Sequence, residues 1–269
     1  MMQTMPHATP HQFYRHPQLP WVELRVSTQS PHHYRLHMHE EYSLGLVDQG
    51  HAIFTHAKGP HHLHVGSMVL IEPHAWHACN PTQITHWSYR MLYIQADWLH
   101  ALLDVPSLRF AQRALNDAQA SQQLHQLCQQ LISGPIHTDD WAQQLRRLLL
   151  QPALIQVQHQ QPIGPDPVVH AALAHWHQSP DCPLRVQTLA HTQGMSASRF
   201  IRHFKTVTGV TPGVYRLNVQ LNGARQLLAQ GSALADAALA MGFADQPHLQ
   251  RTFKAHHAAT PGCYACMTG

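Results

Sequence analysis

The sequence predicts an α+β protein of more than one domain, in which a β-rich N-terminal domain precedes an all-α C-terminal domain with two helix-turn-helix units. Three observations support this prediction. Short β-type runs dominate residues 21–94, helical spacing of apolar residues replaces them after residue 96, and a segment repeats near the C-terminus at an interval of 49 residues. A chain of 269 residues is long enough for two such domains.

The first part of the chain alternates between short apolar runs and turn residues. The runs lie at residues 42–47, 52–55, 67–71 and 87–94. Many short strands without helices between them predict an antiparallel sandwich or barrel. Residues 1–20 show no comparable pattern, and we expect them to form a flexible N-terminal segment ahead of a domain over residues 21–155.

Helices are expected over about 96–155, the last part of this domain. Two sets of apolar residues have the spacing of an amphipathic helix: Leu124, Leu127, Cys128 and Leu131, then Trp141, Leu145, Leu148 and Leu149. Two interpretations stand for this pair of helices. Residues of about 118–150 form a homodimer interface, or the helices simply cover one end of the barrel.

A Gln- and Pro-rich segment at residues 156–167 is predicted to be a linker, because its prolines prevent a continuous helix. The charge balance changes across this segment. Residues 1–165 hold nine Lys and Arg against ten Asp and Glu, whereas residues 166–269 hold eight against four. A polyanionic partner is therefore expected to bind the C-terminal domain, residues 168–269.

The internal repeat supports this expectation. Arg202, Phe204-Lys205, Thr211-Pro212-Gly213 and Tyr215 each recur 49 residues later. In each copy a short apolar helix is followed by a glycine for a tight turn, at Gly194 and Gly242. A helix N-cap comes next, at Ser196 and Asp245. Helix, glycine turn and helix form a helix-turn-helix unit, and two copies at a fixed interval predict a double reader of DNA.

The exposed polar residues of the two second helices are the candidate DNA contacts. Residues expected to read bases are Ser198, Arg199 and Arg202 in the first unit and Gln246, His248, Gln250 and Arg251 in the second. Lys205 and Lys254 are expected to contact phosphates. For each Arg and Lys, the alternative to DNA contact is that the side chain lies on a solvated helix face.

Residues 184–264 resemble the DNA-binding domain of the AraC/XylS family of regulators. The resemblance is carried by LAHTQGMSASRFIRHFKTVTGVTPGVY and ALAMGFADQPHLQRTFKAHHAATPGCY, joined by QLNGARQLL. It implies seven helices, two units in adjacent major grooves, double-stranded promoter DNA as partner and, for an activator, RNA polymerase. Three residues depart from the family pattern: Gln220 for arginine, Pro247 for serine and Ala258 for glycine.

The N-terminal domain resembles the cupin-like sensor half of such regulators over residues 30–100. Its two motifs contain His37-Met38-His39 and the stretch GSMVLIEPHAWHACN at residues 66–80. The resemblance points to His37, His39, Glu41 and His77 as a site for an organic effector or for a divalent metal (Zn, Ni, Cu or Fe). A purely structural role for these histidines is the third interpretation.

These residues predict a ligand-responsive transcription regulator that is not an enzyme. Nucleotide-binding and hydrolase motifs such as GxGxxG, GxxxxGK[ST], HExxH and GxSxG do not occur. The alternative is a metal-dependent cupin enzyme tethered to a DNA-binding domain. With no apolar run near the roughly 20 residues that span a bilayer, and no signal-peptide core at the N-terminus, we expect a cytoplasmic protein without a membrane partner.

Overall fold

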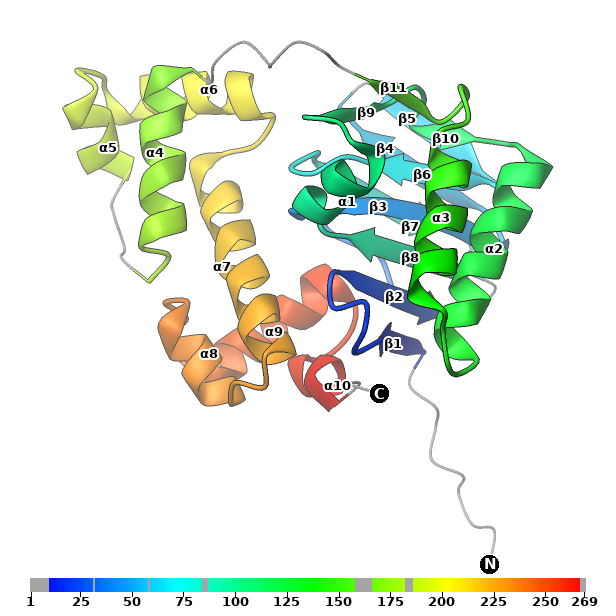
Figure 1. The fold of residues 1–269 in the computed structure, drawn as a ribbon. Coiled ribbons are helices and arrows are strands. Elements are labelled where there is room, and N and C mark those ends of the chain that lie inside the picture. Colours follow the sequence, from blue (N-terminus) through cyan, green and yellow to red (C-terminus); the bar gives the residue numbers. More distant parts are fainter. Residues whose placement is uncertain are drawn as a thin grey trace, which may run out of the picture. The chain divides into compact units, whose positions relative to one another are not determined.

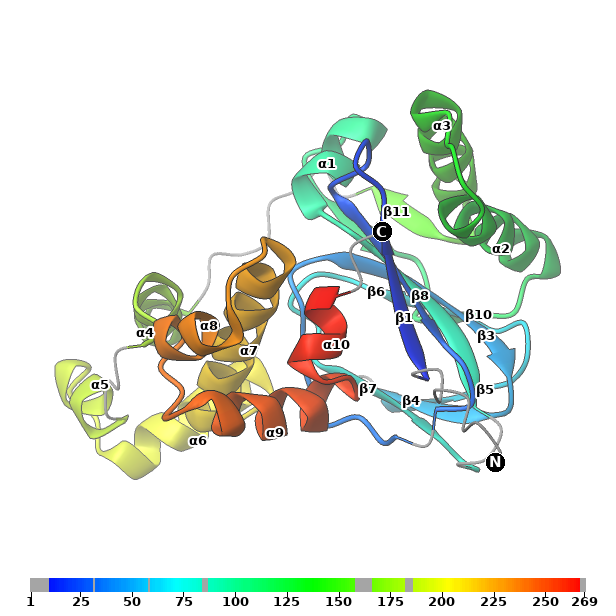
Figure 2. The same cartoon turned by 90° about the horizontal axis from the view of Figure 1, so that it is seen from below.

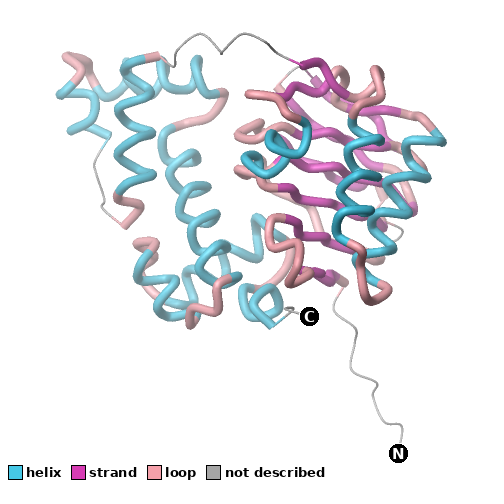
Figure 3. The backbone as a smooth tube through the Cα atoms, viewed as in Figure 1, coloured by secondary structure: helices cyan, strands magenta, loops and turns pink. Residues whose placement is uncertain are grey.

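The computed structural model describes residues 10–30, 32–57, 59–83, 87–157, 166–181 and 186–266. The chain divides into two compact units. Residues 38–160 belong to the first and residues 161–266 to the second, which also includes Arg35–His37. Figure 3 shows strands in the first unit only, whereas the second consists of helices and loops. No helix among the described residues is long and apolar enough to cross a membrane.

Two antiparallel sheets form the body of the N-terminal unit (Figure 1). The larger has the order β1 (His11–Arg15), β2 (Val22–Ser27), β8 (Ser88–Ile94), β3 (Tyr42–Gln49), β6 (Met68–Ile71), β10 (Ala114–Leu115). The smaller has the order β5 (Gly59–Leu63), β4 (Ala52–His56), β7 (His77–Pro81). Figure 2 shows the smaller sheet facing the larger one on the side away from the helices. The predicted β-rich domain with following helices is confirmed.

Strand β1 corrects the expectation that residues 1–20 are flexible. His11–Arg15 pair along their whole length with Ser27–Glu23 of β2, and Leu19 is buried in the core. The strand sits at the sheet edge and contributes mainly His, Gln and Arg, so its sequence lacks a strong apolar alternation. Residues 1–9 lie outside the described residues.

Helices cover one face of the six-stranded sheet. This face carries a row of paired leucines, Leu24, Leu92, Leu44 and Leu70, all buried. They share a core with α1 (Ala96–Leu103), α2 (Ala118–Ile132) and α3 (Thr138–Leu149). The predicted apolar stripes of α2 and α3 lie in this core, and the Trp141 indole N–H donates to the Leu127 carbonyl at 3.1 Å. The domain's own sheet therefore accounts for both stripes.

A two-stranded ribbon ends the domain. In it, β9 (Leu108–Phe110) pairs with β11 (Ile155–Val157), which directly precedes the part of the predicted linker outside the described residues. Sequence patterns did not indicate β9, β10 or β11, because strands of two or three residues are too short to show periodicity.

Seven helices form the described part of the C-terminal unit. They are α4 (Pro167–Gln178), α5 (Val186–Thr192), α6 (Ala197–Thr208), α7 (Pro212–Ala229), α8 (Leu234–Ala240), α9 (Gln246–His257) and α10 (Pro261–Cys266). Helix α7 is the central element, since it contacts α4, α6, α8, α9 and α10. Aromatic side chains fill the core: Trp176 contacts Phe204 and Tyr215, with ring centroids 5.6 and 6.1 Å apart.

Candidate nucleic-acid interface and sensor interior

The first helix-turn-helix unit consists of α5, a turn through Gly194 and α6. Gly194 has φ +63°, a backbone conformation that glycine adopts without strain. The Ser196 hydroxyl then caps α6 by accepting from the Arg199 backbone N–H at 3.3 Å. Because Phe200 and Phe204 are fully buried, the opposite face of α6 is exposed. The predicted DNA contacts on this exposed face are Ser198, Arg199, Arg202 and Lys205.

The second unit repeats this construction with α8, Gly242 and α9. Gly242 has φ +70°, and the Asp245 carboxylate caps α9 by accepting from the His248 N–H at 2.6 Å. Leu249 and Phe253 are buried. The predicted contacts exposed on the other face are Gln246, Gln250, Arg251 and Lys254. Both second helices thus present their arginines and lysines to solvent.

His248 differs from the other predicted base contacts. Its side chain is only partly exposed, and its ring stands edge-on to Phe243 with centroids 5.3 Å apart. Its Nδ1 accepts a long hydrogen bond, 3.4 Å, from the Ala244 N–H. One ring nitrogen is therefore directed at the protein's own turn, which leaves Nε2 as the atom that can reach a ligand.

The sequence repeat corresponds to a repeated packing contact. Phe204 meets Tyr215 with ring centroids 5.7 Å apart, and their counterparts Phe253 and Tyr264 meet at 5.9 Å. Each pair joins a second helix to the helix that follows it. The C-caps are also equivalent, since Gly209 and Ala258 both take the left-handed conformation, at φ 83° and 58°. Ala258 thus occupies a position that favours glycine.

Gln220 stands where the family pattern has arginine, and it connects the two halves of the unit. This buried side chain donates from Nε2 to the carbonyl of Met241 at 2.7 Å and to that of Pro180 at 3.1 Å. Met241 lies in the turn of the second unit, and Pro180 follows α4. The substitution therefore keeps a donor at the centre of the domain without adding a charge.

The two second helices lie on one side of α7. Figure 1 shows α6 and α9 near opposite ends of α7, and Figure 2 shows both along the same edge of the helical unit. Helix α7 has 18 residues and is therefore about 27 Å long. Such a spacer is close in length to one turn of duplex DNA, about 34 Å, the separation that two successive major-groove contacts require.

In the N-terminal unit, two of the four predicted sensor residues meet. The rings of His39 and His77 lie with centroids 4.9 Å apart, and both side chains are buried. His77 Nδ1 lies 2.8 Å from the Ala75 carbonyl, and His39 Nε2 lies 3.2 Å from the Ser43 hydroxyl. Burial, assisted by the neighbouring His39, lowers the pKa of His77 to about 3. This histidine is therefore neutral at physiological pH.

His37 and Glu41 do not complete a metal site with these histidines. His37 is half-buried and its Nδ1 lies 2.8 Å from the carbonyl of Arg35, while the Glu41 carboxylate stays 3.9 Å from His39 Nδ1. Over the described ranges of the chain, no group of three or more His, Cys, Asp or Glu side chains is placed to hold a metal ion. The residues present do not fit the three-histidine arrangement that the cupin resemblance implied.

A buried polar cluster beside these histidines was missed by sequence analysis. Arg25 is 3% exposed, and its Nη2 lies 2.9 Å from the Tyr34 hydroxyl, which hydrogen-bonds the hydroxyl of Tyr89. Tyr93 also hydrogen-bonds Arg25 and stacks edge-on against His39 at 5.3 Å, so the cluster continues to the histidine pair. The signal in the sequence was a charged residue within the alternating strand at residues 22–27.

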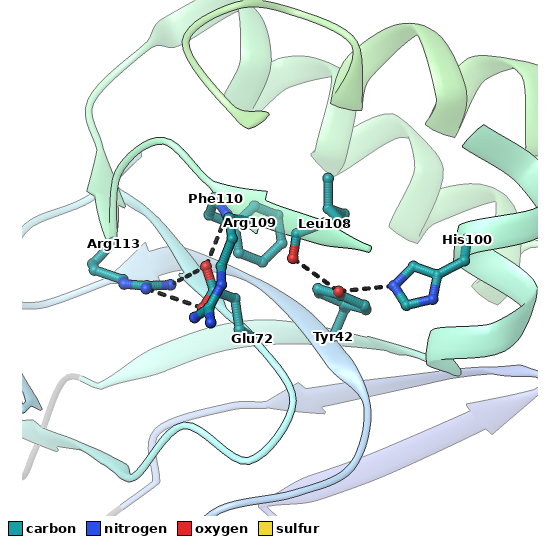
Figure 4. Close-up of polar contacts among 7 residues, drawn as sticks. All are labelled: Tyr42, Glu72, His100, Leu108, Arg109, Phe110 and Arg113. Carbon is teal, nitrogen blue, oxygen red and sulfur yellow. Dashed lines mark hydrogen bonds and ion pairs between the residues drawn. The ribbon is translucent and has the colours of Figure 1, made fainter. Parts of the chain in front are cut away.

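Glu72 holds the terminal ribbon against the sheet (Figure 4). Its carboxylate lies 2.8 Å from Arg109 Nη1 and 2.7 Å from Arg113 Nη1, and it accepts from the Phe110 N–H at 2.9 Å. Burial raises the pKa of Glu72, but the two guanidinium groups and this N–H outweigh burial and lower it overall. Nearby, the Tyr42 hydroxyl donates to the Leu108 carbonyl at 2.9 Å. Glu72 and Tyr42 thus fix β9, the strand that pairs with β11.

Comparison with known proteins finds a matching family model for each unit. The family model described as the AraC-like ligand binding domain matches residues 20–157, and a helix-turn-helix domain model matches residues 189–266. The chain belongs to the AraC family of transcription regulators. It is accordingly a DNA-binding regulator with a ligand-binding domain, as the two resemblances implied.

Relatives of this AraC-family chain agree in sequence and in fold. An uncharacterised HTH-type regulator, YbfI of Bacillus subtilis (strain 168), is 24% identical over 222 residues, 79% of this chain and 80% of the relative. A regulator of Haemophilus influenzae is 33% identical over 101 residues, 37% of this chain and 34% of the relative. An apo form of ToxT from Vibrio cholerae shares the fold, with a TM-score of 0.61, 11% identity and coverage of 93% and 98%. ToxT solved with an unsaturated fatty acid gives a TM-score of 0.60, 11% identity and coverage of 98% of both chains.

Proposed function

We propose that this AraC-family regulator places α6 and α9 in successive major grooves of promoter DNA. The observation that carries the proposal is the equivalent exposure of Arg202 and Arg251, which occupy corresponding positions of two repeated units on one side of α7. Each arginine can bond a guanine edge in bidentate fashion. Lys205 and Lys254 supply phosphate contacts. Each follows the arginine of its helix by three residues, about one helical turn.

Mapping of bound genomic DNA followed by fluorescence anisotropy on the mapped site tests this proposal. Arg202→Ala and Arg251→Ala should each relax base preference in one half-site and cost about 1–3 kcal/mol of binding. Lys205→Ala and Lys254→Ala should weaken binding to all sequences and reduce the salt slope by about one each.

A matched control is Arg147→Ala, which removes one exposed positive charge from α3 of the N-terminal unit. It should leave both affinity and base preference unchanged. If it lowers DNA affinity as much as Arg202→Ala does, the contacts are non-specific and the groove assignment is wrong. The same measurement on alanine variants tests the remaining predicted contacts, Ser198, Arg199, Gln246, His248 and Gln250.

The N-terminal unit is proposed to hold a small organic effector whose binding changes the DNA affinity of the C-terminal unit. Its buried histidine pair and the adjoining tyrosines and arginine form a polar interior, whereas a domain that only supports another would bury apolar groups there. A ligand acts in this way only through unequal affinity for the two states of the protein. ToxT, which shares the fold, has been solved with a bound fatty acid.

The remaining predictions concern assembly and setting. A homodimer through residues 118–150 would appear in sedimentation as twice the 30.4 kDa chain mass. Contact with RNA polymerase would appear as activation of a purified transcription system on the mapped promoter. Binding to chromosomal promoters would place the protein in the cytoplasm. The metal-dependent enzyme is not favoured, because His37, His39 and His77 do not form one ligand group.

A further inference from the structure

The two faces of the six-stranded sheet differ in chemistry. The face toward the helices carries the row of paired leucines described above. The residues that alternate with these leucines along the strands lie on the opposite face. Three of the cross-strand pairs there are Arg25 with Met91, Ser27 with Tyr89, and Ser43 with Tyr93. Strand geometry alternates the two faces, so this polar set is directed at the inside of the domain, toward the smaller sheet. His39 and His77 border the same interior.

Arg25 lies at the centre of this polar face. Its Nε donates to the Ser27 hydroxyl at 3.2 Å, and its Nη2 lies 3.2 Å from His11 Nδ1 and 2.9 Å from the Tyr34 hydroxyl. Aromatic rings surround the guanidinium, with its carbon 5.3 Å from the centroids of Phe13 and of Tyr34 and 5.8 Å from that of Tyr89. None of these partners carries a carboxylate.

Arginines on β1, β8 and around β9 of the same domain are paired with carboxylates. The ion pairs are Arg15 with Glu23 at 2.7 Å, Arg90 with Asp48 at 3.0 Å, and Arg113 and Arg109 with Glu72 at 2.7 and 2.8 Å. Arg25 is more buried than any of these, yet it forms no ion pair with a carboxylate of the described residues. Burial of a charge without an opposite charge is costly, and the carboxylate of a bound ligand would offset that cost at Arg25.

The geometry points to an anion site inside the N-terminal unit, in which Arg25 binds the carboxylate of a small polar organic acid with help from the hydroxyls of Tyr34 and Tyr89. This inference rests on the proposed effector response and names its ligand class. An arginine fork matches a carboxylate in shape and charge. Burial raises the pKa of Tyr89, so its hydroxyl stays protonated and able to donate.

The polar surroundings argue for a small polar acid over a long aliphatic one. Near Arg25 the polar side chains of Tyr93, Ser43, His39 and His77 offer hydrogen bonds, while Met91 and Phe54 add apolar surface. An aliphatic chain would offer these polar groups only apolar contact, whereas a hydroxy, amino or second carboxyl group can exchange hydrogen bonds with them. Amino acids, hydroxy acids and short dicarboxylic acids satisfy both requirements.

The test uses the full chain and calorimetric titration with the protein amino acids, C3–C6 hydroxy acids and C4–C6 dicarboxylic acids. Each acid is paired with its carboxamide or methyl ester, which keeps the size and removes the charge. We expect at least one acid to bind and its uncharged counterpart to bind at least about 30-fold more weakly. Arg25→Met should weaken binding of the same acid at least about 30-fold, and Tyr34→Phe should weaken it about 5- to 10-fold.

Tyr42→Phe is the matched control, because it also removes a buried hydroxyl but on the helix-facing side of the sheet. It should leave acid affinity unchanged. Binding of no acid in the panel, equal binding of an acid and its amide, or equal effects of Tyr34→Phe and Tyr42→Phe would each overturn the anion site. Tyr34→Phe keeps the test decisive should Arg25→Met fail to fold.

DNA affinity, measured in parallel by anisotropy, separates this inference from the proposed function. Acid binding that requires Arg25 but leaves DNA affinity unchanged upholds the anion site and refutes the effector response. DNA binding that responds equally to an acid and to its amide upholds the effector response and refutes the anion site.

Discussion

Asp166 and His203 join the start of the helical domain to α6, the second helix of its first helix-turn-helix unit. The Asp166 carboxylate caps α4 by accepting from the N–H groups of Val168 and Val169, at 3.0 and 3.1 Å. Its other oxygen lies 3.0 Å from Nε2 of His203 on α6. Asp166 lies near the end of the predicted linker and is the first residue described after position 157, so one carboxylate connects the end of the linker to α6.

Asp166→Asn should lower the melting temperature of the C-terminal unit and weaken DNA binding. The N–H bonds at the cap and the pairing with His203 lower the pKa of Asp166, so its contribution is present above the carboxyl's ordinary pKa and is lost as pH falls through its lowered value. Calorimetric melting and anisotropy measure the two effects. Asp236→Asn, an exposed acid in the first turn of α8, should change neither quantity. Equal effects of both substitutions would show that overall charge, and not the Asp166–His203 contact, is responsible.

The two equivalent C-caps predict stability changes of opposite sign. Ala258→Gly should stabilise the protein by up to about 1 kcal/mol, because the left-handed conformation costs an alanine more than a glycine. Gly209→Ala should destabilise it by about 1 kcal/mol for the same reason. Urea unfolding measures both. Loss of stability in Ala258→Gly would mean that burial of the alanine methyl outweighs the backbone strain.

Gly242 and Gly194 occupy the same place in the two units but have different surroundings. A Cβ at Gly242 would lie 2.7 Å from the Asp181 Cα, whereas a Cβ at Gly194 would meet no atom within 4 Å. Both have positive φ, so Gly194→Ala should cost about 1 kcal/mol and Gly242→Ala clearly more, on the order of 2–3 kcal/mol. Urea unfolding tests the order. Equal costs would contradict the close approach of the Asp181 backbone.

The neutral His77 predicts acid sensitivity of the N-terminal unit. Its pKa is about 3 in the folded protein and near 6.5 when exposed, so the unfolded state binds a proton first as pH falls. Stability should therefore be full above pH 6.5 and decline from there to about pH 3, by several kcal/mol at about 1.4 per pKa unit.

His77→Gln removes this titration and should flatten the decline. Unfolding by urea at a series of pH values measures it, with His64→Gln, an exposed histidine, as the control that retains the wild-type slope. An unchanged slope in His77→Gln would show that other groups cause the acid sensitivity.

Glu72→Gln should destabilise the N-terminal unit by about 2–3 kcal/mol. The change leaves the half-buried Arg113 without its carboxylate, while Arg109, which is 46% exposed, can turn to solvent and reduce the loss. Thermal unfolding measures the effect. The exposed Asp97→Asn in the first turn of α1 is the control and should stay within about 0.5 kcal/mol of the parent. An effect of Glu72→Gln no larger than this control would show that the two arginine pairs are replaceable by water.

Patterns that repeat along the chain allowed accurate prediction. Amphipathic spacing predicted α2 and α3 and their buried faces, and the 49-residue repeat predicted both helix-turn-helix units with Ser196 and Asp245 as caps. The exposure of Arg202 and Arg251 followed from the burial of Phe204 and Phe253 on the opposite faces. Elements without periodicity were missed, as with β1, whose assignment depends on pairing with β2.

The sequence by itself therefore determined the division into two domains, the two helix-turn-helix units and the residues they expose. Helix faces and caps depend on neighbours within a few residues, which a sequence pattern records. Tertiary structure alone decided the interior of the N-terminal unit. It brought Arg25 together with Tyr34 and Tyr89, and His39 together with His77, since strand pairing sets which distant side chains share one face. The physical reason is that charge and hydrogen bonding act across space, whereas sequence patterns report only spacing along the chain.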